Sequence, residues 1–232
     1  MASPPIPAHR GRVPWQGLLL AVSLLIFWSP PASAQLSVQS INTAEGKTVV
    51  LRMLNRPPRT AGFVWYKGLK TDYRHFIVSV AWHIRRYRTG PEYNGRQVAN
   101  LEGSLIINKV DLSDSGIYTV IAYLHDSNKE IGFGHLNVYQ PVRMPTLLAT
   151  NTEVTEQKDS VVMTCYTDAL STHWLFNAEH LTLRHDRMKL SDDHKTLTID
   201  PVRREDSGNY QCKVSNPISS IESAPVELDV NY

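Results

Sequence analysis

The chain carries one pattern twice: a tryptophan within a short apolar segment, followed further along by Asp-Ser-Gly-x-Tyr. The first copy joins Val64-Trp65-Tyr66-Lys67 to Asp114-Ser115-Gly116-Ile117-Tyr118, and the second joins His173-Trp174-Leu175 to Asp206-Ser207-Gly208-Asn209-Tyr210. An alternating apolar segment precedes each tryptophan, at residues 49–53 and 161–165. Such alternation is typical of a strand with one face in a core. The repeat therefore predicts two β domains of the same kind in tandem.

Cys165 and Cys212 are the only cysteines of the chain, and they flank the second tryptophan. This Cys…Trp…Cys order, with Tyr210 two residues before the second cysteine, predicts an all-β immunoglobulin-like sandwich. In an exported protein the two cysteines should form a disulfide that contributes roughly 2–4 kcal/mol. A catalytic or metal-binding pair is the alternative, but no ligand-spaced His or Cys accompanies them. Met53 and Val120 occupy the equivalent positions of the first domain, which must rely on apolar packing.

The two copies differ in length. The first places 49 positions between Trp65 and Asp114, against 32 between Trp174 and Asp206. The extra residues leave room for two edge strands, which predicts a variable-type domain over 35–139 and a constant-type domain (C2/I-like) over 140–232. Arg96 lies 18 positions before Asp114, a spacing typical of the salt bridge that closes a variable-type domain. We interpret this pair as structural rather than partner-binding.

Residues 1–34 have the features of a secretory signal peptide. Arg10 and Arg12 precede an apolar run at 18–28, and Ala32-Ser33-Ala34 forms a small-residue cleavage site. The run is shorter than the roughly 20 residues that span a bilayer. The final segment, 227–232, has no hydrophobic tail of the kind that precedes a lipid anchor. We therefore expect a secreted, extracellular product that reaches a cell surface only through a partner or in an alternative form.

Several motifs resemble the carcinoembryonic-antigen-related cell adhesion molecule family of the immunoglobulin superfamily, and the resemblance covers nearly the whole chain. It is similar to a short, secreted-type member, as in the pregnancy-specific branch of the family. The matching motifs are Pro14-Trp15-Gln16-Gly17-Leu18 in the leader, Trp65-Tyr66-Lys67-Gly68, Thr89-Gly90-Pro91 and Gly95-Arg96 in the first domain, and Arg187-Met188-Lys189-Leu190-Ser191, Thr196-Leu197-Thr198-Ile199 and Val214-Ser215-Asn216-Pro217 in the second.

The resemblance implies a binding protein without enzymatic activity or cofactor. Members of this family bind like or related molecules in trans, usually through one sheet face of the first domain. Two features depart from the family: an anchor is missing, and the chain has no Asn-x-Ser/Thr glycosylation site.

Alternation predicts the residues of such a binding face. Trp65, Tyr118 and Val120 should point into the core, so their neighbours should point outward on one sheet. An exposed apolar sheet face marks a contact surface, and aromatic residues dominate the energy of such surfaces. The alternative is that loops or the second domain cover this face. The predicted face comprises Val64, Tyr66, Leu69, Thr71, Phe76, Ile121, Tyr123, Lys129 and Ile131, with the residues after Lys67-Gly68 assigned to the next strand.

The most basic stretch is His83-Ile84-Arg85-Arg86-Tyr87-Arg88. Arg85, Arg86 and Arg88 could contact a polyanion weakly, although a charged edge strand protected from aggregation explains them better. The charge pattern does not fit a nucleic-acid-binding protein, because no single basic surface is predicted.

Catalytic and metal sites find no support. His180, His185 and His194 lie near acidic residues, but their spacing matches no metal motif. The chain has neither a nucleophile elbow nor a phosphate-binding glycine loop.

The sequence thus predicts a recognition protein that modulates cell adhesion, signalling and immune regulation. Two alternatives stay open: a truncated or splice form of an anchored adhesion receptor, and an extracellular matrix protein that self-assembles.

Overall fold

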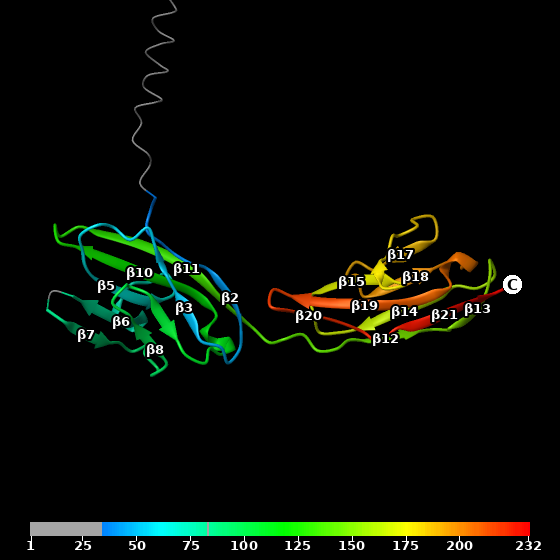
Figure 1. Cartoon of the computed structure of the whole chain (residues 1–232), viewed down its shortest axis with the longest axis horizontal. Coiled ribbons are helices and arrows are strands. Elements are labelled where there is room, and N and C mark those ends of the chain that lie inside the picture. The colour runs from blue at the N-terminus through cyan, green and yellow to red at the C-terminus, as the bar shows by residue number, and fades with distance from the viewer. Residues whose placement is uncertain (1–33, 83) are drawn as a thin grey trace, which may run out of the picture. The chain divides into compact units, whose positions relative to one another are not determined.

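The structure is a computed structural model that describes residues 34–82 and 84–232 (Figure 1). Most of the expected signal peptide, residues 1–33, and His83 of the basic stretch lie outside the described residues. Within the described ranges, every regular element is a strand or a short 3-10 helix. No helix there is long and apolar enough to cross a membrane.

The first domain is a sandwich with a large and a small sheet. The large sheet has six strands in the order β2-β11-β10-β5-β6-β7, the small one has the order β3-β9-β8, and β1 pairs with β4. Strands β6 and β7 extend one edge of the large sheet, which confirms the variable-type prediction. The elements are β1 (Ser37–Val38), β2 (Ile41–Ala44), β3 (Val49–Leu51), β4 (Met53–Leu54), β5 (Thr60–Lys67), η1 (Tyr73–His75), β6 (Phe76–Ala81), β7 (Arg86–Thr89), β8 (Gln97–Ala99), β9 (Leu105–Ile107), η2 (Leu112–Asp114), β10 (Gly116–Leu124) and β11 (Lys129–Tyr139).

At the two positions that correspond to the cysteines of the second domain, the sheets of this domain are joined by apolar packing and not by a disulfide. Val120 pairs with Trp65, as Cys212 pairs with Trp174 in the second domain. Met53 packs against the same core. Its Cε occupies the space where a side chain on Gly103 would project, and Gly103 has a φ of +96°, so this position requires glycine.

The second domain has two sheets of more equal size. Their orders are β12-β14-β18-β17 and β13-β21-β19-β15-β16, and β20 also pairs with β19. Only the two-residue β16 extends beyond β15, as expected for a constant-type (C2-like) domain. The elements are β12 (Thr146–Ala149), β13 (Glu153–Thr155), β14 (Val161–Tyr166), β15 (Ser171–Phe176), β16 (Glu179–His180), β17 (Met188–Leu190), β18 (Thr196–Ile199), η3 (Arg204–Asp206), β19 (Gly208–Asn216), β20 (Ser219–Glu222) and β21 (Val226–Asn231).

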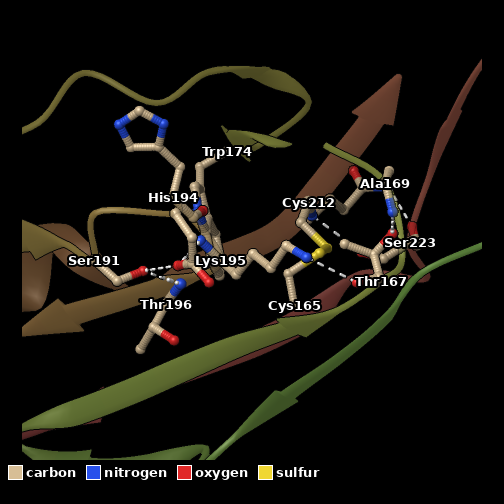
Figure 2. The surroundings of a disulfide bond; sticks show 12 residues. Cys165, Thr167, Ala169, Trp174, Ser191, His194, Lys195, Thr196, Cys212 and Ser223 are labelled. Carbon is tan, nitrogen blue, oxygen red and sulfur yellow. Dashed lines mark hydrogen bonds between the residues drawn. A yellow bond between two sulfur atoms is a disulfide. The ribbon is translucent and has the colours of Figure 1, made fainter. Parts of the chain in front are cut away.

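The predicted disulfide between Cys165 and Cys212 is present and joins the two sheets of this domain (Figure 2). Both cysteines are buried, with their Cα atoms 6.2 Å apart. The backbone N–H of Cys212 donates to Ser223 Oγ at 3.1 Å. Nearby, the indole Nε1 of Trp174 donates to the carbonyl of His194 at 2.8 Å, which ties this core to the loop before β18.

Both domains close one end of the sandwich with the same tyrosine hydrogen bond. Tyr118 Oη donates to the carbonyl of Asp114, and Tyr210 Oη donates to the carbonyl of Asp206, each at 2.9 Å. Burial raises the pKa of both phenols well above the ordinary value, so each hydroxyl stays protonated and keeps its donor role.

An arginine paired with a buried aspartate accompanies each of these tyrosines. In the first domain, Arg96 makes two hydrogen bonds to the carboxylate of Asp114, at 2.6 and 2.9 Å, as its spacing indicated. In the second domain, Arg187 contacts Asp206 through Nη1 and Nη2, and its Nη2 also lies 2.8 Å from Glu205. Sequence reasoning missed this second pair, although its separation of 19 residues nearly repeats the first.

Replacing Arg187 with Ala should destabilise the second domain by about 3–5 kcal/mol, because Asp206 would be left as a buried charge without its partner. Urea unfolding measures this loss. Lys213→Ala is the control, since its ion pair with Glu222 is more than 40% exposed on both sides and should change stability by less than about 1 kcal/mol. Equal losses for the two variants would contradict this account.

Reduction of the disulfide should lower the melting temperature of the second domain alone. Its removal releases a loop that spans 47 residues, and such a loss typically costs about 2–5 kcal/mol. Peptide-resolved hydrogen exchange with and without dithiothreitol separates the domains. Faster exchange in residues 161–166 with unchanged exchange in residues 116–124 is the expected result. An equal change in both segments would show that the first domain depends on the bond as well.

Candidate recognition face

The six-stranded sheet of the first domain turns one face toward the core, and we call the opposite one the outer face. Register between neighbouring strands identifies its residues. Trp65 lies beside Val120 and Val78 in the core layer, so residues one position away belong to the outer face. Three rows of the outer face run across β11, β10, β5 and β6. They are Phe133, Thr119, Tyr66 and Phe76; then Ile131, Ile121, Val64 and Ser79; then Lys129, Tyr123, Gly62 and Ala81.

Large apolar side chains lie exposed along the β10 and β11 side of this face. Phe133 is 54% exposed, Ile131 43% and Tyr123 42%. Ile131 and Tyr123 were predicted from the sequence, whereas Phe133 was missed. The signal was available, because Ile131-Gly132-Phe133-Gly134 alternates large residues with glycine along one strand. These three residues form what we call the apolar strip.

Two central residues of the predicted face are not accessible, which corrects the sequence interpretation. Tyr66 and Ile121 lie on the outer face, but they are only 9% and 3% exposed. Flanking side chains cover the middle of the sheet: the ring of Phe76 lies 6.1 Å from that of Tyr66, and Tyr73 packs on Phe76 at 6.4 Å. This burial raises the pKa of Tyr66. Substituting Tyr66 or Ile121 would thus perturb packing as well as contact, and Val64 and Phe76 are half-buried beside them.

Leu69 and Thr71 are exposed but do not lie on a strand, contrary to the sequence prediction. Strand β5 ends at Lys67, and Gly68 has a φ of +84°. The carbonyl of Gly68 accepts a hydrogen bond from Thr119 Oγ1 at 2.7 Å. The chain then forms a loop, and Asp72 caps the short helix η1, so the next strand begins only at Phe76.

One end of the outer face carries a charged residue and a small hollow. Lys129 is exposed at the start of β11, as the sequence indicated. A hollow of about 230 Å³ is lined in part by Gly62, Val64, Ser79 and Tyr123.

The basic stretch forms a turn and an edge strand. Arg85 has a φ of +46° in the turn, and Arg86 and Arg88 lie on β7, which ends the six-stranded sheet. All four residues of β7 are exposed. This position fits the interpretation of a charged edge that resists pairing with another chain.

No metal site forms among residues 34–82 and 84–232: they contain no group of three or more His, Cys, Asp or Glu that could hold an ion. The histidines singled out in the sequence are separated, with His180 on β16 and His194 in the turn before β18.

Comparison with known proteins identifies an immunoglobulin-type domain in each half of the described chain. An immunoglobulin V-set domain model matches residues 37–139, and an immunoglobulin domain model matches residues 145–216. An I-band fragment of titin shares the fold at 20% identity and a TM-score of 0.51, over 84% of this chain and 64% of the titin chain.

Two solved structures are much more similar. Murine CEACAM1b is 36% identical, with a TM-score of 0.78, over 85% of this chain and 99% of its own. A chain in the complex of the mouse coronavirus receptor-binding domain with its murine receptor is 34% identical, with a TM-score of 0.77, over 85% of this chain and 100% of its own. On this identity and coverage, the chain belongs to the carcinoembryonic-antigen-related cell adhesion molecule family, non-enzymatic recognition proteins of the immunoglobulin superfamily.

Proposed function

We propose that this protein is a secreted recognition protein that binds a second copy or a related immunoglobulin-type cell-surface protein through the outer face of its first domain. Such binding would modulate adhesion and the signalling and immune regulation that depend on it. Family membership supplies the general role of adhesion-type recognition. The single observation that supports the site is the apolar strip of Tyr123, Ile131 and Phe133, which lies exposed on a sheet face where a solvated sheet would carry polar side chains.

The composition of the strip suits a protein partner. Large apolar and aromatic side chains that lose water on contact contribute most of the binding energy at protein interfaces. Thr119 and Ile121 lie on the same face beside Phe133 and Ile131 and are buried, so the strip borders a closely packed part of the sheet. A rigid surface lowers the entropy lost on binding.

Export is supported by the leader motif and by the disulfide of the second domain, since such bonds persist in oxidising compartments. The relative from the coronavirus complex shows that a protein similar to this one acts as a receptor for a viral domain. The same outer face is our candidate for any such foreign partner.

Ile131→Glu combined with Phe133→Glu should abolish self-association or binding to related receptors, because two charges would be buried at the contact. Sedimentation equilibrium measures self-association, and staining of receptor-bearing cells measures binding to relatives. The matched control is Val98→Glu, since Val98 is 44% exposed on β8 of the other sheet. Unchanged binding by the double variant, with a native circular dichroism spectrum, would place the recognition site elsewhere.

Expression of the full chain in mammalian cells should release a product into the medium that begins at Gln35. Amino-terminal sequencing and intact mass identify the cleavage site. Changing Ala32 and Ala34 to bulky residues should block cleavage, because signal peptidase requires small residues there. A product that keeps residues 1–34, or stays with the membrane fraction, would refute export as a cleaved protein.

A further inference from the structure

A second concave site lies in the first domain, lined by residues of the β6–β7 hairpin, the segment after β8 and Arg56. It is a hollow of about 690 Å³ whose lining includes Val80, Trp82 and Leu101. Pockets for small molecules typically have volumes of about 300–1,000 Å³ and apolar walls with a few polar groups. We call this site the arginine pocket, and its lining contains none of Tyr123, Ile131 and Phe133.

Three arginines line the pocket, namely Arg56, Arg85 and Arg86, and none of the described residues that line it is acidic. None of the three forms an ion pair with a carboxylate in the described ranges 34–82 and 84–232. Unpaired guanidinium groups at the mouth of an apolar hollow favour an anion, and their planar donors match a carboxylate or sulfate.

Trp82 provides an aromatic wall that is held in place on two sides. Its ring packs edge-on against Phe63 in the core at 5.7 Å, and the guanidinium carbon of Arg56 lies 5.4 Å from the ring centroid. Arg56 also donates to the carbonyl of Glu102 at 3.3 Å, which fixes its side chain over the pocket. The buried indole N–H of Trp82 meets no acceptor in the part of the chain that the structure describes. Because this N–H has almost no exposed surface, the indole offers the pocket its apolar ring rather than a donor.

We propose that the arginine pocket binds a small organic anion, with its carboxylate or sulfate against Arg56 and Arg86 and its apolar body against Val80, Trp82 and Leu101. The arginines favour an anionic group and the apolar lining favours a hydrocarbon body, so a ligand needs both features to bind well. A free fatty or aromatic acid and an anionic lipid share this chemistry.

Octanoate is the probe, and isothermal titration calorimetry on the intact protein measures its binding, because the fluorescence of Trp82 would overlap that of Trp65 and Trp174. Octanoate should give a saturable heat of binding, whereas 1-octanol, which lacks the charge, and acetate, which lacks the apolar body, should each bind at least about tenfold more weakly, a difference of about 1.4 kcal/mol. Octanol binding as tightly as octanoate, or the absence of any saturable heat of binding, would overturn the proposal.

Arg56→Ala combined with Arg86→Ala should weaken octanoate binding by about tenfold or more, while the matched control Arg88→Ala should stay within about twofold. Arg88 lies on β7, the strand of Arg86, but it does not line the pocket. If Arg88→Ala weakens binding as much, the arginines form an open polyanion surface and the pocket assignment fails. Leu101→Glu is an independent test, because Leu101 is highly exposed and a carboxylate there would repel the ligand without disturbing the core.

Competition with vesicles distinguishes the two sources of the ligand. Displacement of octanoate by phosphatidylserine vesicles, but not by phosphatidylcholine vesicles, would assign the pocket to a lipid head group. Binding of octanoate that neither vesicle displaces would assign it to a free acid.

Discussion

A buried aspartate at the Asp-Ser-Gly turn holds each domain together at one end. In the first domain, Asp114 accepts from the guanidinium of Arg96 and from its own turn at the N–H of Asp111, while its carbonyl accepts from Tyr118. Asp206 repeats this arrangement with an arginine, the N–H of Arg203 and the hydroxyl of a tyrosine. Because the arginine precedes a strand of one sheet and the tyrosine lies on the other, each aspartate connects the two layers. A buried carboxylate with this many partners is costly to disrupt.

The two domains join their two sheets differently in the centre of the core. The second closes its core with a covalent bond next to Trp174, whereas the first places Met53 and Val120 at those positions. A flexible thioether and a branched side chain fill the space by shape alone. The stability of the first domain then depends on the fit of its apolar core around Trp65. This same domain presents both the outer face and the arginine pocket.

The outer face has buried side chains at its centre and exposed apolar side chains along one side. Cross-strand packing of aromatic side chains buries Tyr66, and neighbouring strands bury Ile121. On strand β11, by contrast, Ile131 and Phe133 remain exposed to water. The proposed contact surface therefore lies along β10 and β11. Strand β7 at the far edge of the same sheet is basic, with Arg86 and Arg88, and the proposed anion site includes Arg86.

The sequence by itself determined the fold, the disulfide, the variable-type and constant-type order and the pair of Arg96 with Asp114, because each depends on local alternation or on a fixed spacing along the chain. Alternation also placed Tyr66, Ile121 and Tyr123 on the outer face once Trp65 was placed in the core, but it missed Phe133 on β11. Only the tertiary structure decided which of these residues meet water, because exposure depends on side chains from other strands, as Phe76 over Tyr66 shows. Local pattern also did not predict where strands end. Strand β5 ends before Gly68, which has a positive φ, and Leu69 and Thr71 lie in the loop that follows. The arginine pocket brings Arg56 and Arg86 together, and no motif or spacing in the chain relates these two residues.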